Sequence, residues 1–344
     1  MSKFLKFGVP VVVIAGVAVW LNQSGSQKTE VATETSPAVV FDMGGKFDKS
    51  FNQSVYDGME RFKAETGQSY QEFEVTNASQ REQAIRRFAQ RGANPIISVG
   101  FAQAAAVEVV AGESPNVNIT LIDMVVDKPN VQSVVFKEEQ GSFLVGMLAA
   151  MKSATGTVSF VGGMDIPLIR RFACGYAQGA QYVNKDVKVI SNMTGTTPSA
   201  WNDPAKGTEL AVSQFDRGSD VVFAAAGGTG VGVYQAAKDA GKYAIGVDSN
   251  QNHLHPGTML TSMVKRVDVA AYNSLKAMKD GTWKGGFQSL GLAEGGVDWA
   301  LDENNKALIT AEMKAAVDAA KADIISGKIT VHDYMSDNTC PALD

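Results

Sequence analysis

Acidic, amide and aromatic side chains follow several of the short apolar runs in this sequence. Asp42, Asp123 and Asp248 each come directly after a run rich in β-branched residues. The segments around them also hold glycines, which allow close backbone approach. A small polar ligand with a flat ring would need this combination of acceptors and stacking surfaces. The loops of this type span residues 42–52, 100–103, 123, 162–172, 194–203, 227–230 and 248–251.

Short motifs of catalysis and phosphate binding do not fit this chain. The run GGTGVG fails the dinucleotide pattern G-x-G-x-x-G, because the sixth position counted from Gly228 is Val233. The sequence has no Walker A loop, no G-x-S-x-G elbow and no H-E-x-x-H helix. Asp42 and Asp48 could form an acid–base pair, but Asp48 precedes a predicted helix, where a carboxylate stabilises the N-terminus. We expect a binding protein that is not an enzyme and needs no cofactor or metal.

Histidines and cysteines are few. His253 and His255 stand two residues apart without a third histidine or a cysteine nearby, which favours exposed loop residues over metal ligands. The two cysteines, Cys174 and Cys340, are too few for a four-thiolate site. Two interpretations of Cys174 remain open: a buried inert thiol, or a disulfide with Cys340 in a chain outside the cytoplasm.

These residues must be positioned by alternating strands and helices. Ser50 and Gln53 resemble a capping box for a helix that ends at Gly67, and Ser79 with Glu82 resembles another. Alternation of this kind predicts parallel sheets covered by helices. Strands are expected at residues 38–41, 73–76, 95–99, 118–122 and 132–136.

The alternation begins again after a helix expected at residues 140–152. Asp203 and Pro204 start a further helix that Gly218 ends. This second run, after a reset near residues 138–156, predicts two similar α/β lobes. In such folds ligands bind beyond the carboxyl ends of the strands. The later strands are expected at residues 157–161, 187–191, 220–225 and 243–247.

Composition excludes some partners. The 344 residues include 31 basic and 36 acidic ones, which leaves a net charge of −5. Nucleic-acid binding needs clustered lysine and arginine, so we expect no nucleic-acid partner. The hydrophobic fraction of 45% against 19% charged residues predicts a packed globular protein, which we expect to be a monomer.

The amino terminus has the order of a secretory signal. Lys3 and Lys6 precede an uncharged apolar run over residues 7–21, and a small polar stretch follows. We expect residues 1–26 to be a cleaved signal peptide or an uncleaved anchor, and residues 27–36 to be a tether. Both interpretations place the body in the periplasm or cell envelope. No cysteine lies near this segment, which does not fit a lipoprotein signal.

Several longer motifs together carry a family signature. They are FDMGGKFDKSFNQSVYDGMERF, FVGGMDIPLIRRFACGYAQGA, NDPAKGTELA and IGVDSNQ…LTSMVKRVDVAAY. In this order they resemble the basic membrane protein family, the PnrA-like (purine nucleoside receptor A) substrate-binding proteins of ABC transporters. The resemblance covers about residues 38–335.

The resemblance implies a type I periplasmic-binding-protein fold. Such a fold has two α/β lobes, each a parallel sheet flanked by helices, joined by three hinge crossovers. Residues 37–137 plus 266–290 would form the N-terminal lobe, and residues 138–265 plus 291–344 the C-terminal lobe. The implied function is capture of a nucleoside, in this family a purine nucleoside, and its delivery to membrane permease subunits.

The resemblance also implies a ligand site. Phe51, in the D-K-S-F-N motif, would form one face of an aromatic clamp, with Asn52 beside it. Trp201 would form the other face, at a position where family members usually have Phe. The further implied site residues are Asp42 and Asp123 as partners of the base or sugar, Asp248 and Lys265 as ribose ligands, and Phe172 and Gly228 as lining.

Six of these residues also have a structural interpretation. Phe51 lies on the apolar stripe of a predicted helix and could be core. Lys265 could be a solvated surface cation, and Gly228 could serve a tight turn. The strand-end residues Asp42, Asp123 and Asp248 could cap turns.

Other functions remain to be separated by experiment. The same pocket would suit a subunit that presents its ligand to a membrane sensor. A flavin could also occupy an aromatic clamp that contains Trp201. A nucleoside hydrolase would need an acid cluster of the D-x-D-x-x-x-D-D type near the start, which this sequence lacks.

Overall fold

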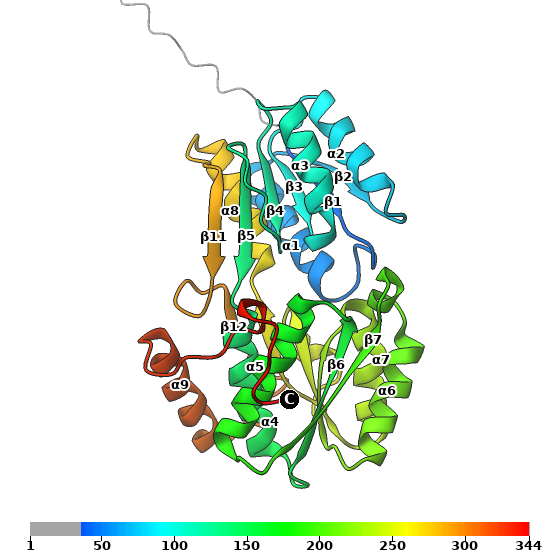
Figure 1. Ribbon diagram of the computed structural model, residues 1–344, viewed down its shortest axis with the longest axis vertical. Coiled ribbons are helices and arrows are strands. Elements are labelled where there is room, and N and C mark those ends of the chain that lie inside the picture. Colours follow the sequence, from blue (N-terminus) through cyan, green and yellow to red (C-terminus); the bar gives the residue numbers. More distant parts are fainter. Residues whose placement is uncertain (1–35, 344) are drawn as a thin grey trace, which may run out of the picture. The chain divides into compact units, whose positions relative to one another are not determined.

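Two six-stranded sheets make up the body of the protein. The computed structural model describes residues 36–343; the predicted signal or anchor at residues 1–26 lies outside them, as does most of the predicted tether. The first sheet has the strand order β11-β5-β4-β3-β1-β2 and the second has β12-β10-β9-β8-β6-β7 (Figure 1). All neighbouring strands pair in parallel except β12, which runs antiparallel to β10.

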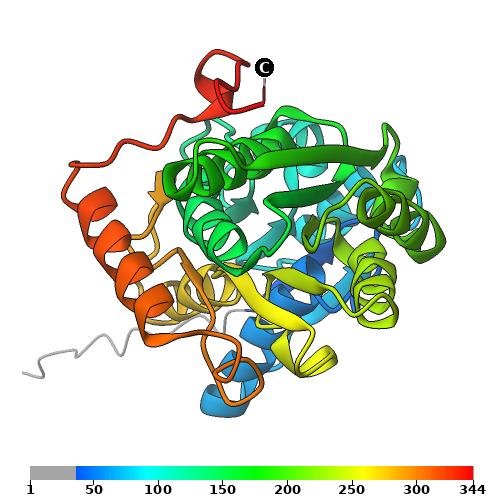
Figure 2. The same ribbon diagram turned by 90° about the horizontal axis from the view of Figure 1, so that it is seen from below.

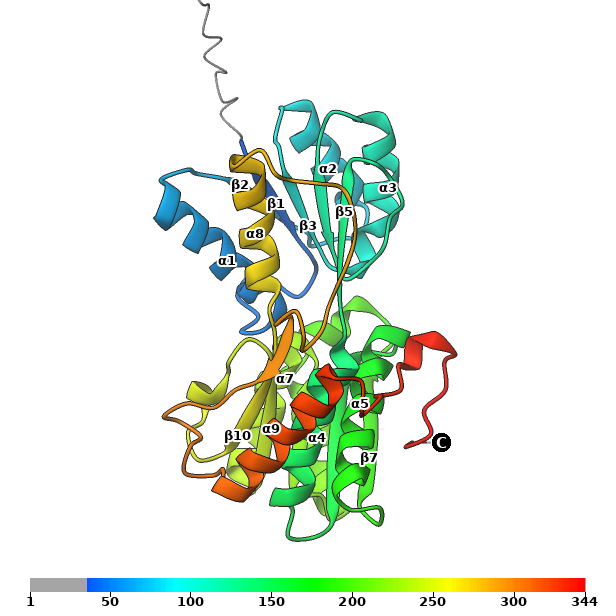
Figure 3. The ribbon, with the colours of Figure 1, turned by 90° about the vertical axis from the view of Figure 1, so that its left-hand side faces the viewer.

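The first sheet comes from the first half of the chain plus one later strand. Most of its strands are short, apolar and buried, as expected where helices cover both faces. Figure 3 shows α1 and α8 on one face of this sheet and α2 and α3 on the other. The elements are β1 (Ala38–Phe41), α1 (Phe51–Thr66), β2 (Gln71–Glu74), α2 (Gln80–Gln90), β3 (Ile96–Val99), α3 (Ala104–Glu113), β4 (Ile119–Ile122), β5 (Val131–Phe136), α8 (Val267–Lys279) and β11 (Gly286–Leu290).

The second sheet repeats the pattern. Helices α4, α5 and α9 lie on one side of it, and α6 and α7 lie on the other (Figure 1). The pair α4 and α5 packs closely because Gly179 has no side chain; a Cβ there would lie 1.9 Å from the carbonyl oxygen of Phe143. The elements are α4 (Glu138–Lys152), β6 (Thr157–Met164), α5 (Pro167–Val183), β7 (Lys188–Gly195), α6 (Pro204–Asp216), β8 (Val221–Ala225), α7 (Gly230–Asp239), β9 (Tyr243–Asp248), β10 (Met259–Lys265), β12 (Val297–Trp299) and α9 (Ala311–Ile325).

The chain passes between the two sheets three times. It leaves the first sheet after β5, returns to it after β10, and leaves it again after β11. The fold class predicted from the sequence is therefore confirmed, including the three crossovers. The strands of each sheet lie inside the ranges expected for the two lobes, while the residues that bound each lobe stay a prediction.

The strand expectations were right in place but not always in length. The strand expected at 73–76 begins two residues earlier, and those expected at 157–161 and 187–191 extend to Met164 and Gly195. Helix α3 and all elements after β9 were not predicted. One of these, β11, is an edge strand with exposed side chains, so it lacks the apolar run that marks a buried strand.

Both predicted capping boxes are wrong. The side chain of Ser50 makes no capping bond to α1. Asp48 takes this role, because its carboxylate accepts hydrogen bonds from the backbone N–H groups of Asn52 and Gln53 at 3.0 and 3.1 Å. The side chain of Ser79 makes no capping bond to α2 either. By contrast Asp203 caps α6 through the N–H of Lys206, as expected.

The C-terminal segment is fastened to α5. Cys174 and Cys340 form a disulfide, so of the two interpretations of these cysteines the structure has the bonded one. On the same helix Arg171 makes a bidentate ion pair with Asp333, at 2.7 and 2.8 Å. Figure 2 shows this segment, in red, running from α9 back to α5. Within residues 36–343 no helix has the length and apolarity that crossing a membrane requires.

Candidate functional site

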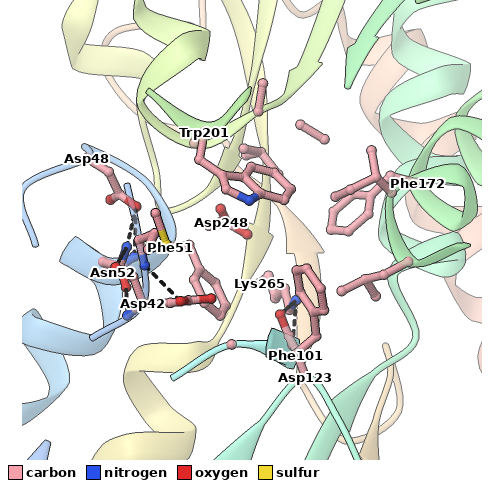
Figure 4. Close-up of a pocket in the computed structure, with 18 residues that line it drawn as sticks. Asp42, Asp48, Phe51, Asn52, Phe101, Asp123, Phe172, Trp201, Asp248 and Lys265 are labelled. Atoms are coloured by element: carbon pink, nitrogen blue, oxygen red, sulfur yellow. Dashed lines mark hydrogen bonds and ion pairs between the residues drawn. The ribbon is translucent and has the colours of Figure 1, made fainter. Parts of the chain in front are cut away.

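A cavity lies where strand ends of both sheets meet. It receives residues from each of the seven loops that the sequence singled out. Eight of the nine predicted site residues line it: Asp42, Phe51, Asn52, Asp123, Phe172, Trp201, Asp248 and Lys265 (Figure 4).

The ninth residue, Gly228, lies beside this cavity and does not line it. Its neighbour Gly227 lines the cavity instead, and the role of Gly228 toward a ligand stays a prediction. Gly228 borders an adjacent depression. A Cβ on Gly228 would meet the side chain of Asn202 and the carbonyl of Trp201 at 3.3 Å. Gly227 and Gly228 are neighbours in this tight turn, yet they border different depressions.

Backbone conformation directs two of the carboxylates. Asp123 follows β4 and Asp248 ends β9, with φ angles of 74° and 63°. A non-glycine residue is rarely found in this left-handed region, although aspartate tolerates it better than most. Such conformations concentrate at functional sites, because the surrounding structure must hold them. Here they bring two buried carboxylates to the cavity wall.

Lys265 is the central cation of the site. Its ammonium lies 2.7 Å from Asp123 and 2.9 Å from Glu138, and the side chain is 2% exposed, which rules out a solvated surface lysine. Burial would lower the pKa of Lys265, but the carboxylates of Asp123 and Glu138 outweigh that effect and raise it. The ammonium also lies 5.2 Å from the ring centre of Phe51.

Burial raises the pKa of the two cavity carboxyls that Lys265 influences to about 6. One is Asp123, whose pKa is lowered by Lys265 and raised again by Glu138. The other is Asp248, whose pKa is held down by Lys265 and by the hydroxyl of Ser50. Both carboxyls are therefore mostly ionised at neutral pH and become neutral in mildly acidic solution.

Asp42 and Asn52 hold the cavity wall at the start of α1. The carboxylate of Asp42 accepts a bond from the Arg81 guanidinium at 2.9 Å and one from the N–H of Met43 at 2.8 Å. Burial raises the pKa of Asp42 in spite of Arg81. The Asn52 side chain accepts from the backbone N–H of Asp42 at 3.2 Å. Asp42 is thus paired with Arg81 and also lines the cavity.

Among the polar and aromatic residues that line the cavity, two were missed as site residues. Asp48 was expected to stabilise the start of α1, which it does, and it also lines the cavity; burial raises its pKa to about 6. Phe101 lines the cavity after β3. It lies in the 100–103 loop that the sequence marked, so an aromatic residue directly after a strand end was the available signal.

Aromatic rings surround the centre of the cavity. Phe51 belongs to α1 beside the first sheet, while Trp201 ends the short 3₁₀ turn Pro198–Trp201 beside the second. Figure 4 shows the Trp201 ring above the space, Phe51 on the opposite side, and Phe172 and Phe101 together at a third side. A flat ring between Trp201 and Phe51 would have an aromatic surface on each face.

Hydrogen bonds connect the loop before α1 with the loop after β9. The hydroxyl of Ser50 donates to the carboxylate of Asp248. The carbonyl oxygen of Lys49 accepts from Ser249 at 2.9 Å and from Gln251 at 2.8 Å. The two loops belong to different sheets, so these bonds hold the cavity closed on this side.

Acceptors outnumber cations in this cavity. Four buried carboxylates line it, while Lys265 is the cation among its lining residues and Arg81 approaches Asp42 from behind. Such a wall favours a ligand that donates hydrogen bonds through hydroxyl, amino or ring N–H groups. It disfavours an anionic ligand, because like charges repel strongly at a buried site.

Two sheets that are parallel except for β12, linked by three crossovers and with a cavity at their strand ends, have the architecture of the type I periplasmic-binding-protein fold. A solute-binding protein of an ABC transporter system from Aeropyrum pernix K1 has the same fold: its structure superposes with a TM-score of 0.80 at 30% identity, covering 87% of this chain and 93% of that one. A similar protein from Conexibacter woesei, at 23% identity and a TM-score of 0.72, shares the fold and covers 87% of this chain and 99% of that one.

Family comparison then narrows the class. The model of the Bmp family, described as ABC transporter substrate-binding protein PnrA-like, matches residues 35–334. This chain belongs to that family. It is 33% identical over 350 residues to the ABC transporter nucleoside-binding protein BmpA of Lactococcus lactis subsp. cremoris, covering 94% of this chain and 97% of that one. It is 34% identical to basic membrane protein D of Borreliella burgdorferi, covering 75% and 77%.

Proposed function

We propose that this protein captures a nucleoside, with a purine base, between its two lobes and delivers it to the permease subunits of an ABC transporter. The single observation that carries the proposal is the cavity itself. It combines aromatic rings on opposite sides with buried carboxylates at strand ends. A nucleoside matches both features, because it has a flat base and a sugar rich in hydroxyl donors.

The rings and the carboxylates would contribute differently. Stacking of a base on an aromatic side chain is worth about 1–3 kcal/mol and tolerates any base. A buried carboxylate that expects a hydroxyl or amino partner penalises a ligand that lacks it. In this proposal Phe51 and Trp201 supply affinity, while Asp123, Asp248 and Lys265 supply specificity.

The charge of the cavity favours a nucleoside over a nucleotide. A phosphate would add negative charge next to the buried carboxylates of Asp48 and Asp248. The described cations near the cavity are already paired: Lys265 with Asp123 and Glu138, and Arg81 with Asp42. We therefore propose that the 5′ position of the sugar must be uncharged for binding.

Lobe closure would connect capture to transport. A ligand that contacts both lobes favours the closed state by its difference in affinity for the two states. The closed form would then present the surface that the permease recognises. We propose binding without turnover, by a monomer with the two lobes bounded as the sequence predicts. A sensor subunit would use the same cavity but would pass its signal to a receptor.

The location proposed for this protein is outside the cytoplasm. The disulfide between Cys174 and Cys340 supports it, because such bonds persist in oxidising compartments. Residues 1–26 would provide export, either as a cleaved signal or as an anchor. Mass spectrometry of the mature protein from the cell envelope distinguishes these two cases.

Calorimetry on protein unfolded and refolded to remove bound ligand tests the proposal. The panel is adenosine, guanosine, inosine, cytidine, uridine, adenosine monophosphate and riboflavin. Micromolar or tighter binding of purine nucleosides, lost in Trp201→Ala and in Asp248→Ala and absent for the monophosphate, is the expected result. Heat from riboflavin alone, or from none of these compounds, would refute the assigned ligand and leave the fold unaffected.

A further inference from the structure

Gly163, near the end of β6, lies directly behind the Trp201 ring. A Cβ built on Gly163 would lie 2.3 Å from Cζ3 and 2.5 Å from Cε3 of the indole. Contacts of this kind ordinarily begin near 3.4 Å, so the ring edge occupies space that any side chain at position 163 would need. Gly163 does not have the positive φ angle that would by itself favour glycine. Space for the indole is therefore the reason for glycine at this position.

The carbonyl oxygen and the Cβ of Trp201 also have close glycine neighbours. A Cβ on Gly227 would lie 3.2 Å from the Trp201 carbonyl oxygen, and one on Gly44 would lie 3.5 Å from the Trp201 Cβ. Trp201 lines the cavity, whereas Gly163 does not. The indole thus packs against the backbone of Gly163 on one side and lines the cavity on the other, while Gly227 and Gly44 lie close to the Trp201 backbone and Cβ. Figure 4 shows the Trp201 ring and the Phe51 ring on different sides of the cavity.

We propose that Gly163 is a specificity-determining residue that sets the width of the gap between Trp201 and Phe51. A side chain at position 163 would move the indole edge by about 1 Å into the cavity, the difference between 2.3 Å and an ordinary contact of 3.4 Å. A flat base that fits between two rings tolerates little narrowing, because close-packed contacts are steep at short range. This inference rests on the proposed binding of a nucleoside and adds the residue that controls entry of its base.

The test is a set of four variants of the full-length chain, titrated with adenosine and guanosine by calorimetry. Gly163→Ala should raise Kd at least about fivefold, the lower end of the range for losing one stacking contact. Trp201→Phe removes Cζ3 and Cη2, so adding Gly163→Ala to Trp201→Phe should change Kd by less than about threefold. Gly195→Ala is the matched control on the neighbouring strand β7, because its Cβ would meet Ala200 at an ordinary 3.7 Å. It should leave Kd unchanged.

A measurement without ligand separates this inference from the proposed function. In a chain with Trp20, Trp283 and Trp299 replaced by Phe, the fluorescence comes from Trp201 alone. Gly163→Ala should change the emission maximum and the acrylamide quenching of Trp201, and Gly195→Ala should change neither. If the wild-type chain binds no nucleoside, the proposed function fails, and the fluorescence still decides whether Gly163 seats the indole.

Three results would overturn the proposal. The first is wild-type Kd in Gly163→Ala, and the second is unchanged Trp201 fluorescence in that variant. The third is an equal loss of affinity from Gly163→Ala in the wild-type chain and in the Trp201→Phe variant, which would indicate a general backbone effect. If Gly163→Ala alone does not fold, recovery of folding and binding on adding Trp201→Phe supports the proposal, and failure to recover contradicts it.

Discussion

Replacement of Ser50 by alanine tests whether the hydrogen bond from the Ser50 hydroxyl to Asp248 holds the two lobes together. Ser50 lies at the start of α1 and is fully buried, and its hydroxyl donates to the Asp248 carboxylate in the other lobe. The helix itself should not be disturbed, because Asp48 and not the Ser50 side chain caps α1. Ser50→Ala therefore removes a bond between the two lobes and leaves the cap of α1 unchanged.

The magnitude follows from the charge of the acceptor. A hydrogen bond to an ionised group contributes about 1.5–3 kcal/mol. In the proposed lobe opening this bond breaks, so its loss should weaken ligand binding by about 10- to 150-fold. The Ser50 hydroxyl also lowers the pKa of Asp248, which burial raises to about 6. Without that hydroxyl the Asp248 pKa should be higher still, so binding should be lost at a higher pH than in the wild type.

The assay is calorimetric titration with a purine nucleoside from about pH 5 to pH 8, alongside thermal unfolding of the ligand-free protein. Ser98→Ala is the matched control: Ser98 is a buried serine in the same lobe, and its hydroxyl has no hydrogen-bond partner among the described residues. It should keep the wild-type Kd and pH profile. Unchanged affinity in Ser50→Ala, or weaker affinity with an unshifted pH profile, would refute the closure argument.

Three further predictions concern Asp248, the disulfide between Cys174 and Cys340, and Lys265. For Asp248 the folded pKa of about 6 exceeds the ordinary value of 3.8, so the folded state binds more protons than the unfolded state between about pH 4 and 6. The contribution of Asp248 to the stability of the ligand-free protein is therefore present at low pH and lost as pH rises through about 6. Urea unfolding at about pH 5 and 7 should show a smaller change of stability with pH in Asp248→Asn than in the wild type. Reduction of the Cys174–Cys340 disulfide should lower the free energy of unfolding by about 2–4 kcal/mol, whereas Cys340→Ser should not respond to reductant. Lys265→Met should lower the free energy of unfolding in urea at neutral pH by about 3–5 kcal/mol, because it leaves the Asp123 carboxylate buried without its cation. A decrease below about 1 kcal/mol would contradict the importance of that ion pair.

Much of the site could be found from the sequence because the fold places strand ends together. Asp42, Asp123 and Asp248 each follow an apolar run, and parallel strands end at the same edge of a sheet. The aromatic residues needed the family motifs as well, since helical spacing alone makes Phe51 a core residue as readily as a ligand contact. Phe101 shows the limit of this reasoning: its loop was marked, but a marked loop does not say which side chain turns inward.

Local patterns were less reliable where two side chains compete for one role. Ser50 and Gln53 have the spacing of a capping box, yet Asp48 caps the helix, because a buried carboxylate can accept several N–H groups at once. That exchange frees the Ser50 hydroxyl for Asp248, which is 198 residues away. A pattern that spans a single helical turn has no information about a partner on another lobe.

The sequence by itself determined the class of fold, the strand ends that carry the acids, and the family. These depend on local periodicity and on motifs, both of which are written along the chain. Tertiary structure alone decided that Lys265 is buried between Asp123 and Glu138, that Ser50 joins the two lobes, and that Gly163 seats Trp201. The physical reason is that burial and pairing arise where distant segments pack, so the pKa of a carboxyl or the position of a ring exists only after the two sheets have come together.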